Sequence, residues 1–381
     1  MNFNLPAFET VTLDYAHGQK YVREGAERIA SDRIVSERNS SGVWKPVLKI
    51  IDQTKLPGKV EFLFLRELEE IREAIFSLKV RGAPAIGVAA AIGIYVVASD
   101  FETENYKDFE TAFNAARETL AASRPTAVNL SWALSRMSLV VQSNRDKGVE
   151  AVKNLLLHEA LKIRDEDVEA SRKIGEYGLS LIKDGDGILT YCNAGQLATV
   201  KYGTALAPLH LGRERGYSFK VYACETRPLL QGARLTAFEL TADGIDTTLI
   251  CDNMVSQVMK NRWVNAVFAG CDRMAANGDA CNKIGTSAIA ILAKHYGIPF
   301  YICLPVSTID MNIKTGNDIV IEQRDPSEVT EMWYSRRMAP SEVKVFNPAF
   351  DVTDHELITA IVTEKGIIRP LFGERLQKMM G

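Results

Sequence analysis

The residues best suited to chemistry lie in one stretch, residues 270–286. It follows the apolar run 266–269, which predicts a buried strand, and it precedes a helical pattern. The stretch holds Asp272 at the end of the predicted strand and the pair Asn282 and Lys283. An acid beside fixed amide and ammonium donors suits proton transfer on a phosphorylated ligand. An ordinary polar connection from strand to helix fits equally well, so the rest of the chain must decide.

Further reactive or polar groups stand where other predicted strands end. From residue 188 onward, short apolar runs alternate with helical patterns, which is typical of a parallel sheet with helices on both faces. In such sheets ligands bind beyond the carboxyl ends of the strands. The predicted strands are 188–192, 219–224, 247–251, 266–271 and 298–304. The groups at their ends together indicate a site: Cys192-Asn193, Glu225-Thr226-Arg227, Asp252-Asn253, Asp272-Arg273 and Pro305-Val306-Ser307.

Among the cysteines, Cys192 is the best candidate for a reactive thiol. It ends a predicted strand and opens a predicted helix, and the dipole at a helix N-terminus favours the thiolate. Burial without reactivity is the commoner fate of cysteine, and we expect it for Cys224, Cys251 and Cys303. Cys271 is expected to face the core.

The turn after residues 219–224 offers groups that could bind a charged ligand. Arg227 can pair with an anion, and Gln231 can orient a ligand through its amide. Glu225 and Arg234 in the same turn fit a purely structural pair about equally well.

Two arginines in the first half of the chain are candidate phosphate ligands. The motif Arg81-Gly82-Ala83-Pro84 combines a guanidinium with a backbone that can approach an anion closely, directly before an apolar helix. Arg124, which precedes a proline, is the second candidate. Taken without context, a plain surface position fits either arginine better.

Length and composition limit the classes of function. A chain of 381 residues predicts two domains, and 46% hydrophobic with 24% charged residues is typical of a soluble globular protein. The net charge of −3 argues against nucleic-acid and membrane partners. Six cysteines without a CxxC pair, with five scattered histidines, predict reduced thiols in a cytoplasmic protein without structural zinc.

The sequence lacks the motifs of P-loop nucleotide binding, zinc proteases, serine hydrolases and dinucleotide binding. The sequence has no GxxxxGK[ST], HExxH or GxSxG motif, and no GxGxxG follows a predicted strand. Asp272 and Asp279 are a poor metal pair, because no further carboxylates follow at calcium-loop spacing. We therefore expect neither a cofactor nor a metal.

The predicted elements divide the chain into four parts. Residues 1–45 are polar and irregular, without a signal-peptide pattern, and form an extension of unknown role. Residues 46–150 form a mostly helical domain: strands 45–53 and 59–65 make a hairpin, and helices cover 67–79, 83–99, 109–122 and 131–142. Helix 83–99 is predicted to be buried in the core rather than in a membrane. One long or broken helix is predicted from residue 149 to residue 183. As a domain segment, residues 151–184 connect the helical domain to the sheet domain, 185–381.

Together these motifs resemble the methylthioribose-1-phosphate isomerase family. The resemblance runs in order from about Ile51 to Pro370. The wider family also includes regulatory subunits of the eukaryotic translation-initiation nucleotide exchange factor and ribose-1,5-bisphosphate isomerase. The matching stretches are Arg81-Gly82-Ala83-Pro84-Ala85-Ile86-Gly87, Arg124-Pro125-Thr126-Ala127-Val128-Asn129-Leu130, Thr190-Tyr191-Cys192-Asn193, Glu225-Thr226-Arg227-Pro228, Gln231-Gly232-Ala233-Arg234, residues 270–286, and Asn347-Pro348-Ala349-Phe350-Asp351-Val352-Thr353.

The resemblance implies an α/β fold: an N-terminal mostly helical domain with a small antiparallel sheet, then a Rossmann-like doubly wound parallel sheet, in a homodimer. It implies an intramolecular oxidoreductase that converts methylthioribose 1-phosphate to methylthioribulose 1-phosphate in methionine salvage. The family's catalytic thiol falls on Cys192 and its catalytic acid on Asp272. The implied substrate contacts are Arg81, Gly82, Ala83, Arg124, Gln231, Asn282 and Lys283.

These residue types suit the reaction. Phosphate on the anomeric oxygen blocks simple opening of the sugar ring, so an acid must act at the ring oxygen. The hypothesis is that Asp272 begins protonated and supplies that proton, while Cys192 acts at the C1–C2 end. Hydrogen transfer through an enediolate and as a hydride both remain open.

The sequence departs from the family beside the thiol. The family pattern Cys-Asn-Thr-Gly-Ala is here Cys192-Asn193-Ala194-Gly195-Gln196. This change leaves 5-deoxyribose 1-phosphate, or another ribose 1-phosphate, as an alternative substrate. A non-catalytic regulatory subunit is the alternative from another class. The retained acid and thiol argue against it, because a binding module needs neither.

Overall fold

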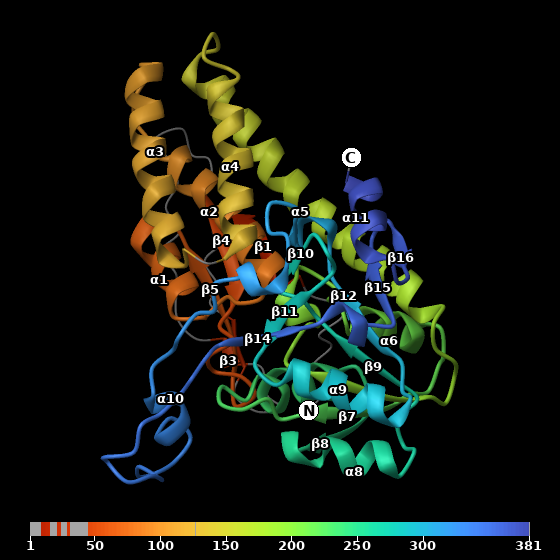
Figure 1. The fold of residues 1–381 in the computed structure, drawn as a ribbon. Coiled ribbons are helices and arrows are strands. Elements are labelled where there is room, and N and C mark those ends of the chain that lie inside the picture. The colour runs from red at the N-terminus through yellow and green to blue at the C-terminus, as the bar shows by residue number, and fades with distance from the viewer. Residues whose placement is uncertain (1–8, 16–20, 24–28, 31–44, 126, 381) are drawn as a thin grey trace. The chain divides into compact units, whose positions relative to one another are not determined.

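The computed structural model describes residues 9–15, 21–23, 29–30, 45–125 and 127–380 (Figure 1). The chain packs into two compact units. The first, called here the N-terminal unit, comprises Met1–Ala170 and Gln196–Gly203. The second, the Rossmann-like unit, comprises Ser171–Gly195 and Thr204–Gly381.

An antiparallel sheet forms one part of the N-terminal unit. Its strand order is β1 (Val11–Tyr15), β4 (Pro46–Ile51), β5 (Val60–Leu65), β2 (Tyr21–Arg23) and β3 (Ile29–Ala30). The predicted hairpin is confirmed as β4 and β5, which pair antiparallel. The prediction that residues 1–45 are irregular is wrong for the described ones, because β1, β2 and β3 belong to this sheet.

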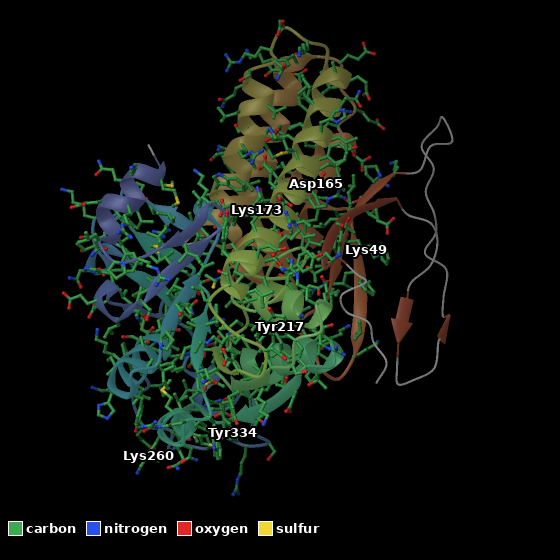
Figure 2. The ribbon with its side chains drawn as sticks, turned by 90° about the vertical axis from the view of Figure 1, so that its right-hand side faces the viewer. Lys49, Asp165, Lys173, Tyr217, Lys260 and Tyr334 are labelled. Carbon is green, nitrogen blue, oxygen red and sulfur yellow. The ribbon has the colours of Figure 1, made fainter. Side chains whose placement is uncertain are left out.

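The reason for that error lies in the alternation of β1. Val11 and Leu13 pair with Ile50 and Leu48 and pack into the core. Side chains of the intervening residues point to the other face of a strand. There Lys49, labelled in Figure 2, places its ammonium 3.3 Å from the Asp14 carboxylate. Two apolar residues among polar ones are too weak a pattern to identify a strand from sequence.

Helices form the rest of the N-terminal unit. They are α1 (Leu68–Phe76), α2 (Ala83–Ser99), α3 (Tyr106–Ser123), α4 (Val128–Gln142) and the first two-thirds of α5 (Val149–Leu179), a single unbroken helix. Every residue of α2 from Ala85 to Ala98 is buried, against α1, α3, α4 and β4, as predicted for a core helix. In the described parts of the chain, no helix is both long and apolar enough to cross a membrane.

A seven-stranded sheet forms the centre of the Rossmann-like unit. Its order is β16 (Gly366–Ile368), β15 (Ala360–Thr363), β12 (Phe300–Cys303), β9 (Ala266–Ala269), β6 (Gly187–Tyr191), β7 (Lys220–Cys224) and β8 (Asp246–Ile250). All neighbours pair parallel except β15 and β16. The predicted doubly wound parallel sheet is therefore confirmed. Its strand order reverses between β6 and β9.

Helices and a second sheet complete this unit. The helices are α6 (Ala207–Glu214), α7 (Ala237–Ala242), α8 (Val255–Lys260), α9 (Thr286–Tyr296), α10 (Ser327–Thr330) and α11 (Phe372–Met380). The second sheet has the order β13 (Ile309–Asp310), β10 (Arg273–Ala275), β11 (Ala280–Lys283) and β14 (Phe350–Thr353). Residues 270–286 are thus not a plain connection from strand to helix. They form the β10–β11 hairpin, whose turn contains Gly278 at a φ of 96°.

Candidate active site

The candidate site in the Rossmann-like unit begins where β6 and β9 end. Tyr191, the last residue of β6, pairs with Ala269, the last residue of β9, so the two strands end at the same level. The loops that follow are in contact, because a Cβ added to Gly270 would lie 2.7 Å from the Ala194 Cβ. This edge is the point of strand-order reversal, where ligands bind in open α/β sheets.

Cys192 occupies this edge in an unusual backbone conformation. Its φ is +62°, a left-handed value that is uncommon for any residue with a side chain. Its N–H donates to Thr226 Oγ1 at 2.9 Å, and its carbonyl accepts from Thr236 Oγ1 at 2.6 Å. The residue is half-buried and packs against the core of the unit.

The predicted helix after Cys192 does not exist. Only a single 3₁₀ turn, Gln196–Ala198, follows, and the next α-helix begins at Ala207. The chain instead loops back, and the N–H of Thr204 donates to the carbonyl of Ala194 at 2.9 Å. A macrodipole needs several aligned peptide units, so the helix argument for a thiolate at Cys192 is wrong.

Asp272 is half-buried between β9 and β10. Its N–H donates to the carbonyl of Cys281 at 2.9 Å, which fixes its backbone to the hairpin. Cys271, predicted to face the core, packs against it in part, and its Sγ lies 3.5 Å from the same carbonyl. Burial raises the pKa of the Cys271 thiol and raises that of Cys281 to about 12, so neither is a ready thiolate.

Of the other three cysteines, two are buried as expected for structural residues, and Cys251 is not. Cys224 and Cys303 are buried, as predicted, and burial raises the pKa of both thiols. Cys251 is only half-buried, so the prediction of full burial is wrong for it. The neighbouring Glu225 carboxylate raises its thiol pKa.

Gln231 follows a tightly held turn after β7. The Asp252 carboxylate accepts the N–H groups of Thr226 and Arg227, both at 2.8 Å. Burial raises the pKa of Asp252, and these two hydrogen bonds oppose that rise. Gln231 itself is buried, and within the described residues its Oε1 has no hydrogen-bond partner. Since buried polar atoms are normally paired, this oxygen is an available acceptor for a ligand hydroxyl.

Arg227, considered as a ligand-binding residue from sequence, makes structural contacts here. Its guanidinium donates to the carbonyls of Val329 at 2.8 Å and Pro228 at 3.2 Å. It also lies 5.8 Å from the ring of Tyr334, which Figure 2 labels. These contacts join the turn to the segment around α10.

Asn282 and Lys283 are consecutive residues of β11, and both are buried. The Asn282 amide donates to Thr286 Oγ1 at 3.0 Å. The Lys283 ammonium donates to the carbonyl of Ala349 at 2.9 Å and lies 4.5 Å from the ring of Phe350. The hydroxyl of Tyr191 donates to the carbonyl of Ile284 at 2.7 Å, so this part of the hairpin is attached to the end of β6.

The remaining predicted contacts belong to the N-terminal unit. Arg81, Gly82 and Ala83 lie at the start of α2, where Gly82 is the N-cap residue with a φ of 96°. A Cβ on Gly82 would lie 2.5 Å from the Ala198 Cα, so both the backbone angle and the close approach require glycine. Arg124 follows the last residue of α3.

The nine predicted residues thus divide between the units. Cys192, Gln231, Asp272, Asn282 and Lys283 lie on the loops and the hairpin around the end of β6 in the Rossmann-like unit, and the other four lie in the N-terminal unit. In the portion of the chain that the structure describes, no group of three or more His, Cys, Asp and Glu side chains is arranged to hold a metal ion.

Sequence reasoning placed Asn193 among the groups at strand ends but missed its partners, Thr236 and Glu239. Asn193 Nδ2 donates to Glu239 Oε1 at 2.6 Å and to Thr236 Oγ1 at 3.1 Å. Glu239 is completely buried. Its position carried a signal, because it shares the helical spacing of buried Leu235 and Leu240 and therefore places a carboxyl on an apolar face.

Known proteins resemble this chain over most of its length. Residues 79–370 match the model of the initiation factor 2 subunit family. A methylthioribose-1-phosphate isomerase of Symbiobacterium thermophilum is 61% identical over 87% of this chain and 92% of its own length. A 5-deoxyribose 1-phosphate isomerase of Petrotoga mobilis is 57% identical over 88% of this chain and 96% of its own.

Among solved structures, the 5-methylthioribose 1-phosphate isomerase of Pyrococcus horikoshii OT3 matches with a TM-score of 0.83 and 42% identity. The match covers 91% of this chain and 95% of that one. Sequence and fold agree over nearly the full length of these proteins, and the chain belongs to the initiation factor 2 subunit family.

Proposed function

We propose that this protein is an isomerase that converts 5-methylthioribose 1-phosphate to 5-methylthioribulose 1-phosphate, an aldose–ketose isomerisation in methionine salvage. The observation that carries the proposal is the 61% sequence identity between this chain and the methylthioribose-1-phosphate isomerase of Symbiobacterium thermophilum, over 92% of that relative. The proposed enzyme is a cytoplasmic homodimer whose ligand is a small phosphorylated sugar.

The proposed catalytic residues are Cys192 and Asp272, in the domain formed by residues 185–381. The net reaction moves the hydrogen on C2 to C1, and C2 becomes a ketone as its hydroxyl loses a proton. The phosphate on C1 prevents ring opening to a free aldehyde. Asp272 would protonate the ring oxygen as the ring opens, and Cys192 would act beside the C1–C2 bond. The positions of both residues at the reversal of strand order support this assignment.

The proposed substrate contacts are the remaining predicted residues. Gln231 Oε1 is a buried acceptor suited to a sugar hydroxyl. Lys283 would supply positive charge in a buried setting, where it attracts phosphate more strongly than it would in water. Arg81, with the backbone at Gly82 and Ala83, and Arg124 would bind the phosphorylated end of the sugar. Asn282 would orient the sugar by its amide.

A second candidate substrate is 5-deoxyribose 1-phosphate. The observation that favours it is the relative from Petrotoga mobilis, which carries that name and is nearly as similar. The residues beside the thiol, Ala194 and Gln196, differ from the pattern of the methylthioribose-1-phosphate isomerase family. They are the first places to look for a difference in substrate preference.

The test compares kcat/KM for the two sugars in the wild type and in Cys192→Ser and Asp272→Asn. We expect preference for the methylthio sugar, and a loss of kcat of roughly 10²–10⁴-fold in each variant, the usual contribution of a positioned acid or base. Cys251→Ser replaces another half-buried thiol and should keep full activity. Preference for the deoxy sugar would select the second candidate. Activity that survived both substitutions would disprove the catalytic assignment, and a wild type inactive on both sugars would favour a regulatory subunit.

A further inference from the structure

The backbone at Cys192 is held from both sides by buried threonines. A left-handed conformation at a residue with a Cβ costs roughly 1–3 kcal/mol and persists only where its surroundings enforce it. Thr226 and Thr236, both fully buried, bind the Cys192 N–H and carbonyl respectively. The peptide units on both sides of the thiol-bearing Cα are therefore fixed.

The protons of this network can be assigned from its geometry. Asn193 Nδ2 has two hydrogens, and one points to Thr236 Oγ1 and the other to Glu239 Oε1. Because Thr236 Oγ1 accepts from Asn193, its own hydrogen is available for the Cys192 carbonyl. The chain of donors therefore runs in one direction, from Asn193 through Thr236 to Cys192, and the Glu239 carboxylate orients the Asn193 amide.

Two glycines without a Cβ allow the polar network to approach the Cys192 loop and the end of β7 closely. A Cβ on Gly195 would lie 1.7 Å from Glu239 Oε1, so the carboxyl lies directly against the backbone of the Cys192 loop. A Cβ on Gly232 would lie 1.7 Å from the carbonyl of Cys224, at the end of β7. Between this glycine and Thr236 the chain forms a π-helical turn, a feature frequent at functional sites.

We propose that Thr236, Asn193 and Glu239 are positioning residues that hold Cys192 in its left-handed conformation and thereby fix the direction of its thiol. This inference rests on the proposed catalytic role of Cys192. Thr236 contacts the cysteine directly, Asn193 orients the threonine hydroxyl, and Glu239 orients Asn193. None of the three needs to contact substrate, so their effect should fall on kcat and not on KM.

The test removes the Thr236 hydroxyl without changing the shape of the side chain. We expect Thr236→Val to lower kcat by roughly ten- to a hundredfold with KM unchanged, as a small misplacement of a reacting group would. Thr236→Ser restores the hydroxyl and should recover kcat. Thr363→Val removes another fully buried hydroxyl, on β15, and should keep kcat although it too loses a hydrogen bond.

A second measurement reports the reactivity of the Cys192 thiol in the absence of substrate. The rate of iodoacetamide alkylation at Cys192, followed by peptide mass spectrometry, should change in Thr236→Val and return in Thr236→Ser. Wild-type kcat and alkylation in a folded Thr236→Val protein would overturn the inference, as would an equal loss of kcat in Thr363→Val. If Thr236→Val does not fold, Thr236→Ala provides the same comparison. If the wild type turns over neither sugar, the proposed function fails, and the alkylation rates still decide whether the network positions the thiol.

Discussion

Two buried regions of the molecule, helix α2 and the surroundings of Cys192, differ in polarity. In the N-terminal unit, α2 is buried on all sides from Ala85 to Ala98, where the Tyr95 hydroxyl is the one polar side-chain group among apolar residues and glycine. In the Rossmann-like unit, the ends of β6 and β7 bury polar side chains instead. Asn193, Thr226, Thr236 and Glu239 are each 2% exposed or less.

This contrast suggests that apolar burial mainly stabilises the fold, whereas the buried polar network mainly positions the Cys192 thiol. Apolar burial is non-directional and roughly proportional to area, so many sequences can satisfy it. A buried polar network is satisfied only in one arrangement, and each unpaired member costs the full desolvation penalty. We therefore expect substitutions in the buried part of α2, residues 85–98, to reduce the free energy of unfolding with kcat unchanged, and substitutions around Cys192 to change kcat.

The largest expected change in stability is at Ile92, a fully buried residue of α2. Ile92→Ala leaves a cavity in close-packed surroundings and should lower the free energy of unfolding by roughly 2–5 kcal/mol. Urea unfolding measures this, and kcat below the unfolding transition should match the wild type. Ile291→Ala is the matched control, because Ile291 is 55% exposed and its truncation should cost less than about 0.5 kcal/mol. Equal costs at the two sites would contradict the burial contrast.

A smaller effect is expected at Gly82, where the backbone itself is constrained. Gly82→Ala forces a Cβ into a left-handed position 2.5 Å from the backbone of Ala198, and should cost roughly 1–3 kcal/mol. KM should also rise, since the backbone here is a proposed phosphate contact. Gly148→Ala has open space around its Cβ and should leave stability and KM unchanged. If Gly82→Ala behaved like Gly148→Ala, glycine would not be required at residue 82.

Elements with strong periodicity were predictable from sequence. The five helices of the N-terminal unit and strands β4 to β9 match the predicted runs, and all of these except the largely exposed β8 bury one face or all of their apolar residues. Short elements with polar alternation were not. The β10–β11 hairpin is nearly all buried in the structure, yet Asn282 and Lys283 make its sequence look like a surface loop. Tertiary contacts, not local pattern, give it strand structure.

The candidate site was predictable in part for a similar reason. The rule that ligands bind beyond strand ends predicted that Cys192 and Asp272 lie near each other without any knowledge of pairing, and Tyr191 and Ala269, which precede them, do pair. The conformation of Cys192 was not predictable, since it depends on hydroxyls 34 and 44 residues away in the chain. The dipole argument failed because the helix predicted after Cys192 does not form, and residues 196–203 pack within the N-terminal unit instead.

The smallest expected effect, expressed per pH unit, concerns a carboxyl on α5 in the N-terminal unit. Asp167 on α5 accepts the N–H of Val200 at 2.7 Å, and burial raises its pKa to about 7. An unfolded chain loses this proton near pH 4, roughly the ordinary value for aspartate. Between about pH 4 and pH 7 the folded state therefore binds more protons, so the free energy of unfolding should fall as pH rises, by at most about 1.4 kcal/mol per pH unit.

Asp167→Asn keeps an acceptor for the Val200 N–H and removes the titration. Its unfolding free energy should vary less with pH across this window than that of the wild type, when both are measured by urea unfolding. Asp165→Asn is the matched control, because Asp165, labelled in Figure 2, is an exposed neighbour on the same helix that pairs with Arg164. The same flattening in both variants would assign the effect to net charge and not to burial. A flatter profile in Asp167→Asn alone, with kcat unchanged, would show that this polar contact serves stability, in contrast to the network around Cys192.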